Sequence, residues 1–279
     1  MIPGQKLFGR RARITIGALQ SEDLRVVFRA KKSLAKEPNT CEVTVYNLSA
    51  DSRAKIQRRG DVLTLEAGYE DLGTLFSGNT DTGTHERVGP DWLTKLHCGD
   101  GEQAYQHTRI SMGFKPGTSA ADVVKAVGKQ MLNGGIDVAA ALNLNLPGQF
   151  SQGYAAQGNA AQELDKLLKG RGYEWSIQDG KLQILQTDKP TNVIVLLNES
   201  SGLVGSPTWA TPEKGSDSSP AKPRTIKFKS LLNHLIRPGC RLRIDSQQIK
   251  TDVRVTELTH FGDTAGQDWY TEGEGVPVT

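Results

Sequence analysis

Several residue types and patterns that signal particular chemistry are scarce or missing in this sequence. Only three cysteines occur in 279 residues, and their wide spacing offers neither a zinc-binding pair nor a disulfide framework. No run of about 18 apolar residues exists, so we expect no membrane-spanning helix. The opening residues also lack the apolar stretch of a secretory signal. These absences predict a chain that folds in a reducing cytoplasm, with its cysteines buried as small apolar side chains.

The signatures of common enzyme classes are missing too. There is no G-x-S-x-G, no Walker A sequence and no G-x-G-x-x-G, and no pair of histidines has the H-E-x-x-H spacing of a zinc protease. The net charge is +3, from 34 basic and 31 acidic residues, which is too balanced to indicate nucleic-acid binding. The sequence therefore predicts no catalytic residue, no metal ligand and no cofactor.

What the sequence does contain is a series of strand patterns. In "TCEVTVYNL", Cys41, Val43 and Val45 alternate with more polar residues, as expected of a half-buried strand. Similar alternation occurs at 24–30, 61–69, 74–78 and 91–98, and a short helix capped by Ser49 interrupts it. Many short strands between glycine-rich turns predict a β-barrel domain over residues 1–98.

The middle of the chain, residues 99–189, has a different character. Helices are predicted near 119–132 and 159–169, with Ser119 and Asn159 as N-caps. The Asp179-Gly180 pair between two alternating runs predicts a tight hairpin over 173–185, since the turn requires positive φ. We expect a small α+β domain here.

The last part, residues 190–279, returns to strands, which predicts a second β-barrel domain. It also contains the polar loop 211–224, which is too polar to be buried. No role can be assigned to this loop from the sequence.

A six-residue pattern relates the first and last parts. "GPDWLT" and "GQDWYT" both read Gly-x-Asp-Trp-x-Thr, and each follows a glycine, Gly60 or Gly239, and two strands. Similar order and spacing indicate two copies of one β-domain flanking the α+β domain. In each copy we expect Gly to form a turn, Asp to accept turn hydrogen bonds, and Trp and Thr to share one strand face, with Trp filling a core. The repeat positions are Gly89, Asp91, Trp92, Thr94, Gly266, Asp268, Trp269 and Thr271.

Two other interpretations compete with a structural role. A cluster of His260, Asp263, Asp268, Glu272 and Glu274 offers ligands for a metal or an acid–base pair, but the first copy has no matching frame of histidine and carboxylates. The helix opening at Ser119 resembles a LysM peptidoglycan-binding repeat over about twenty residues. A cell-wall hydrolase and a peptidoglycan- or carbohydrate-binding module are therefore alternative functions.

The succession of segments resembles one protein family over most of the chain. "EPNTCEVTVYNLSADSRAKI", "GDVLTLEAGYEDLGTLFSG", "GNAAQELDKLLKGRGYEWSIQDGKLQIL" and the "IRPGCRLRID…GDTAGQDWYTE" ending are similar to the tail or baseplate hub proteins of contractile-tailed phages and phage-tail-like particles. The strength lies in the order of the segments, since no single motif is decisive.

This resemblance implies a mainly β fold with two tube-type β-barrels around a small α+β domain. It implies a structural protein that assembles as a trimer and joins a sixfold tail tube to a threefold central spike. The expected partners are other copies of the chain, the tail tube protein, the spike protein and other baseplate proteins, with DNA or a tape-measure protein as possible cargo of the lumen. The expected location is the virion baseplate, after synthesis in the host bacterial cytoplasm.

Overall fold

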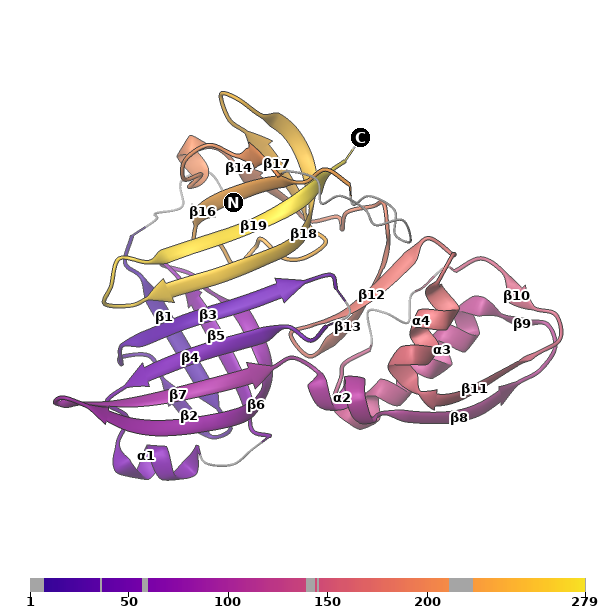
Figure 1. Cartoon of the computed structure of the whole chain (residues 1–279), viewed down its shortest axis with the longest axis horizontal. Helices are drawn as coiled ribbons and strands as arrows, with labels where there is room; N and C mark the ends of the chain where they lie inside the picture. The colour runs from indigo at the N-terminus through magenta and orange to yellow at the C-terminus, as the bar shows by residue number, and fades with distance from the viewer. Residues whose placement is uncertain are drawn as a thin grey trace. The chain divides into compact units, whose positions relative to one another are not determined.

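The computed structural model describes residues 8–35, 37–56, 60–138, 144, 146–210 and 223–278 (Figure 1). Its contacts divide the chain into two compact units. The first contains Met1–Ser33, Thr40–Cys98 and Lys189–Thr279, and the second contains Leu34–Asn39 and Gly99–Asp188. The chain is mainly β with an α+β insertion, which confirms the predicted fold class. The division into three domains stays a prediction, because the first and last of them lie in one unit.

In the described part of the first unit, 13 strands form one sheet. We call residues 8–98 of this unit the first half and residues 189–278 the second half. The strands of the first half are β1 (Arg11–Ile16), β2 (Leu19–Ser21), β3 (Val26–Ser33), β4 (Thr40–Tyr46), β5 (Val62–Gly68), β6 (Leu72–Val88) and β7 (Asp91–Gly99). The strands of the second half are β14 (Ile194–Leu197), β15 (Thr208–Trp209), β16 (Ile226–Leu231), β17 (Arg241–Asp245), β18 (Lys250–Asp263) and β19 (Trp269–Pro277).

The two halves have similar strand orders. The first half runs β3-β4-β7-β6-β5-β1, and the second runs β15-β16-β19-β18-β17-β14. One difference is that β14 lies parallel to β17 whereas β1 lies antiparallel to β5. The halves join where β18 pairs with β3, so the described strands of the first unit form a single sheet (Figure 1). Two separate barrels therefore remain a prediction.

The period-two patterns in the sequence account for the burial of these strands. Cys41, Val43 and Val45 of β4 are buried, whereas the residues between them lie towards solvent. The same alternation buries Leu63, Leu65 and Ala67 in β5 and Leu242 and Ile244 in β17. Burying an aliphatic side chain of this size contributes about 1.5–3 kcal/mol, so one-face alternation specifies which side of the sheet faces a core.

Each half has its own core, but two buried side chains of the second half, Leu232 and Trp269, belong to the core of the first half. The first core contains Phe28, Leu65 and Phe76, and the second contains Phe228, Leu242 and Val255. Trp269 begins the last strand of the second half, yet it packs in the core of the first half. Helix α1 (Ala50–Lys55), with Ser49 as its N-cap, lies between β4 and β5 in sequence.

The second unit is the α+β insertion. Its helices are α2 (Glu102–His107), α3 (Ala120–Gln130), η1 (Met131–Gly134) and α4 (Ala160–Leu168). Its strands form three two-stranded pairs: β8 (Arg109–Phe114) with β11 (Tyr154–Asn159), β9 (Thr118–Ser119) with β10 (Gln149–Phe150), and β12 (Tyr173–Gln178) with β13 (Lys181–Gln186).

The helix caps and the hairpin of this unit follow the sequence. The Asp122 N–H donates to Ser119 Oγ, and the N–H groups of Ala161 and Gln162 donate to Asn159 Oδ1. Asp179 and Gly180 both have positive φ, 56° and 74°, as the turn between β12 and β13 requires. These caps and this turn confirm the local predictions, because each depends on residues close together in sequence.

Candidate functional site

The two Asp-Trp motifs begin equivalent strands, β7 and β19. The Asn47 N–H, directly after β4, donates to the Trp92 carbonyl at 2.7 Å. The Leu232 N–H, directly after β16, donates to the Trp269 carbonyl at 3.0 Å. Each motif strand is therefore fastened at its tryptophan to the end of the neighbouring strand by the same backbone bond.

A second pair of matching bonds lies at the glycines that precede β5 and β17. The Gly60 N–H donates to the Thr80 carbonyl at 2.9 Å, and the Gly239 N–H donates to the Val255 carbonyl at 2.8 Å. Both glycines have positive φ, 98° and 85°, a conformation that a side chain would strain. The glycine is therefore needed in both halves for the same local reason.

A histidine–threonine pair is also present in both halves, and sequence analysis missed it. His85 Nδ1 lies 3.0 Å from Thr94 Oγ1, and His260 Nδ1 lies 2.8 Å from Thr271 Oγ1. Both threonines are fully buried. The signal in the sequence is a Thr-His dipeptide, 84–85 and 259–260, ahead of each Asp-Trp. His260, which the sequence suggested as part of an acid–base pair, thus has His85 as its counterpart in the first half. In each half the histidine pairs with the hydroxyl of a buried threonine.

The surroundings of the two tryptophans differ. Trp269 is 0% exposed and meets Phe28 edge-on, with ring centroids 5.4 Å apart. Trp92 is 36% exposed, and the Arg53 guanidinium lies 4.1 Å from its ring centroid. The prediction that the motif tryptophan fills a core holds for Trp269 and is wrong for Trp92. The reason is that β19 borders the core of the first half, whereas the start of β7 lies beside α1 at the surface.

The turn residues of the motifs also differ in their contacts. Asp91 Oδ1 accepts from the Asn47 side-chain amide at 2.9 Å, whereas the exposed Asp268 contributes its backbone carbonyl to the Asp263 N–H. Gly89 has φ of 61°, and a Cβ placed on Gly266 would lie 2.4 Å from the Asp263 carboxylate. Both glycines are therefore required, one for its φ and one for space.

The supposed catalytic cluster is dispersed in the structure. His260 is 1% exposed, and desolvation together with the positive charge of Lys32 holds its pKa well below the usual value. Asp263 binds the Arg25 guanidinium at 3.1 and 2.6 Å, and that hydrogen bonding lowers the pKa of the carboxyl. Glu272 pairs with Lys229 at 2.8 Å. Within the described ranges, no group of three His, Cys, Asp or Glu side chains is arranged to hold a metal.

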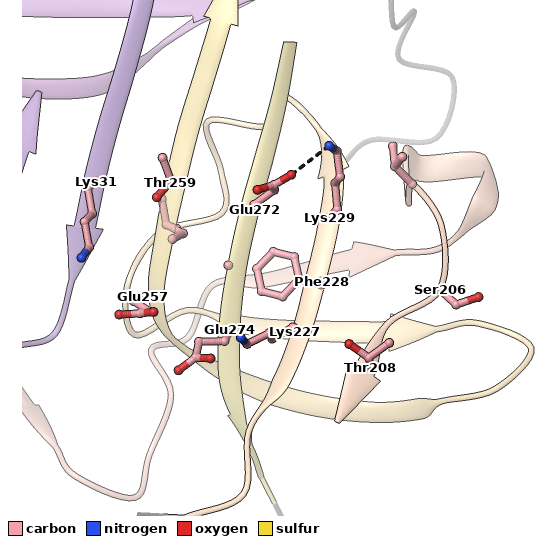
Figure 2. Close-up of a pocket in the computed structure, with 13 residues that line it drawn as sticks. Lys31, Ser206, Thr208, Lys227, Phe228, Lys229, Glu257, Thr259, Glu272 and Glu274 are labelled. Carbon is pink, nitrogen blue, oxygen red and sulfur yellow. Dashed lines mark ion pairs between the residues drawn. The ribbon is translucent and has the colours of Figure 1, made fainter. Parts of the chain in front are cut away.

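A pocket of about 390 Å³ lies on the sheet where β16, β19, β18 and β3 are adjacent (Figure 2). Its charged lining alternates across the strands: Lys227 is the register partner of Glu274, and Lys229 that of Glu272. The remaining lining residues are Lys31, Val204, Ser206, Thr208, Phe228, Glu257, Leu258, Thr259 and Gly273. Opposite charges on neighbouring strands neutralise one another, so this pocket has the character of a solvated sheet face.

The helix that begins at Ser119, the basis of the peptidoglycan-binding alternative, is explained by its packing. Ser119 caps α3, and the apolar stripe Val123, Val124 and Val127 of that helix is fully buried. No helix among the described residues is long and apolar enough to cross a membrane. Of the polar loop 211–224, residues 211–222 lie outside the described residues.

The chain is similar in structure to several solved tail proteins. It superposes on the 43 kDa tail protein of prophage MuSo2 from Shewanella oneidensis with a TM-score of 0.66 and 12% identity, covering 96% of this chain and 97% of that one. A tail protein from Neisseria meningitidis gives a TM-score of 0.64 at 11% identity, covering 96% of both chains. The chain has the fold of bacteriophage tail proteins.

A third similarity extends this fold to another system. A component of the Escherichia coli type VI secretion system, itself similar to the bacteriophage tail proteins gp27 and gp5, matches with a TM-score of 0.62 and 12% identity, over 95% of this chain and 77% of that one. No protein-family model matches the chain, and no curated protein matches it. The resemblance of the sequence to tail and baseplate proteins is thus confirmed at the level of fold.

Proposed function

We propose that this chain is a structural hub protein in the tail baseplate of a phage or phage-tail-like particle. In this proposal three copies form a ring that connects a sixfold tail tube to a threefold central spike. The role is structural and not enzymatic, since the histidine nearest to an acid–base site is buried in a core. The partners are other copies of the chain, the tube protein, the spike protein and further baseplate proteins, and the ring leaves a lumen for DNA or a tape-measure protein.

The observation that carries the proposal is the repetition within the first unit. Three hydrogen bonds recur at equivalent places in the two halves: from the residue after β4 or β16 to a tryptophan carbonyl, from a positive-φ glycine to the long strand, and between a histidine and a buried threonine. The strand orders of the halves match as well. We infer that the halves are two copies of one β-domain.

Two similar domains per chain provide a way to match symmetries. Three chains would present six near-equivalent domains to a sixfold tube, while the differences between the halves would define threefold contacts on the opposite side. Those differences exist: the equivalent tryptophans are 36% and 0% exposed. The structural likeness to a prophage tail protein and to a type VI secretion component supports a baseplate- or spike-type environment.

The direct experiment is to measure the mass of the purified chain, alone and mixed with the candidate tube and spike proteins, by light scattering coupled to size-exclusion chromatography. The proposal predicts a trimer, or a monomer that becomes a trimer when the spike is added. A stable monomer in the presence of both partners would contradict it. A peptidoglycan-cleavage assay of the same sample distinguishes the hydrolase alternative, and the proposal predicts no cleavage.

A further inference from the structure

The junction between the halves shows how one copy of the β-domain joins the next. The edge of β18 that faces away from β19 is shared by two strands. Lys250–Arg254 pairs with β17, and Glu257–Asp263 pairs with β3 through seven register pairs. The Arg25–Asp263 ion pair and the bond from the Val26 N–H to Thr264 Oγ1, at 2.9 Å, fasten the end of this junction.

The first half has the corresponding edge, and no further described strand pairs with it. The equivalent strand is β6: Thr80 corresponds to Val255 through the glycine bonds, and five residues later in each strand His85 corresponds to His260. By this spacing the stretch 82–88 corresponds to 257–263. Val62 to Gly68 of β5 occupy only Leu72–Asn79 of β6. After Asn79, β6 pairs with β7 alone among the described strands.

The second half has the strand that corresponds to β3, and one of its edges is unpaired among the described strands. Leu232 corresponds to Asn47, since each donates to a motif tryptophan carbonyl. Six residues before these positions stand Ile226 and Cys41, whose register partners are Trp209 and Ala30. Trp209 of β15 therefore occupies the place of Ala30 of β3. Among the described strands β15 pairs with β16 alone, whereas β3 pairs with both β4 and β18.

The exposure of Trp209 is consistent with a β15 edge that awaits a partner strand. Ala30 is the register partner of His260 in the β18–β3 junction, and it is 0% exposed in the core of the first half. Trp209 is 44% exposed in the single chain. A large exposed aromatic side chain on a free sheet edge is a typical centre of a protein–protein interface, and an uncovered edge of this kind promotes aggregation.

We propose that β15 of one copy of this chain adds to the open edge of β6, residues 82–88, of a second copy. Transferring the register of the β18–β3 junction places Trp209 opposite His85 of the second copy, and Thr208 opposite Glu86. The two edges are different surfaces, so the contact is head-to-tail, and it closes into a ring when the rotation between copies matches the proposed threefold symmetry. This inference rests on the proposed ring of copies and specifies which strands form its subunit interface.

The experiment is disulfide crosslinking of the full chain. Thr208→Cys combined with Glu86→Cys places two thiols at facing positions of an antiparallel pair, about 4.5–5.5 Å apart at Cα, which suits a disulfide. The native cysteines Cys41, Cys98 and Cys240 are buried and give little background. The matched control combines Thr208→Cys with Gln20→Cys, an exposed residue on the edge strand β2. Covalent multimers are expected from the first pair and not from the control.

A substitution gives a second measurement. Trp209→Ala is expected to weaken self-association by about 30-fold or more, as for a hot-spot tryptophan. Leu196→Ala changes an exposed apolar residue on the β14 edge and is expected to leave association unchanged. Multimers that crosslink only through the control pair, or that form equally well in Trp209→Ala, would overturn this inference and leave the hub proposal standing. A chain that remains monomeric with tube and spike proteins present would contradict the hub proposal itself.

Discussion

Replacing each motif tryptophan by alanine tests whether the two copies of the motif carry equal structural weight. Trp269 is fully buried against Phe28 in the core of the first half, so Trp269→Ala leaves a large cavity. Substitutions of this kind cost about 3–5 kcal/mol. Trp92 is partly exposed, and its main contact is the Arg53 guanidinium. An exposed cation–π contact contributes about 0.5–1 kcal/mol, so Trp92→Ala is expected to cost little more than that.

The assay is urea unfolding followed by far-UV circular dichroism, with the transition of the first unit compared between variants. Trp269→Phe serves as an intermediate variant. It keeps a ring in the core and removes the indole N–H, which finds no acceptor among the described residues, so a smaller loss than for alanine is expected. Equal losses for Trp92→Ala and Trp269→Ala would refute the packing argument, and so would a loss below about 1 kcal/mol for Trp269→Ala.

Two further predictions concern buried polar groups. Burial holds the folded-state pKa of His260 well below its usual value, so in acid the unfolded chain binds a proton that the folded chain does not. The free energy of unfolding is therefore expected to fall below about pH 6.5, by roughly 1.4 kcal/mol per pH unit from this group. His260→Asn should reduce the slope of unfolding free energy against pH by the contribution of about one proton. An unchanged slope would contradict this assignment. In the second unit, the Asp100 carboxylate accepts from the N–H groups of Asp179 at 2.6 Å and Gly180 at 2.8 Å. Asp100→Ala removes the acceptor of these two turn N–H groups and is expected to cost about 2–3 kcal/mol, read from the unfolding midpoint of that unit. Glu102→Ala removes a half-buried carboxylate that accepts from the Gln106 amide at 3.1 Å, and it should change the midpoint less.

The predictions that succeeded from the sequence are those determined by neighbouring residues. Asp179-Gly180 specifies its own turn, Ser119 caps the helix that follows it, and Cys41, Val43 and Val45 define a buried strand face. Each depends on a few consecutive side chains and their backbone preferences. The recurring glycine turns and strand spacing around the Asp-Trp motifs are local features of the same kind, and two copies of one β-domain remain the proposal drawn from them.

What could not be predicted depends on contacts between distant parts of the chain. The pairing of β18 with β3 joins residues such as Phe261 and Arg29, and no local pattern specifies that partner. The crossing of Trp269 into the first core follows from this pairing. Helix α2 was missed because its N-cap, Gly101, is in the left-handed region and makes no side-chain cap bond. The histidine–threonine pairs were missed because a Thr-His dipeptide acquires meaning only once the opposing strand is known.

The central claim is that this chain forms a ring of three in which each copy contributes two similar β-domains. The most direct test is the mass of the assembled full chain with its tube and spike proteins present, measured by native mass spectrometry or light scattering. A mass of three chains, linked covalently through the Thr208→Cys and Glu86→Cys pair, is the predicted result. A chain that stays monomeric, or that forms a closed dimer through a symmetric contact, would contradict the account.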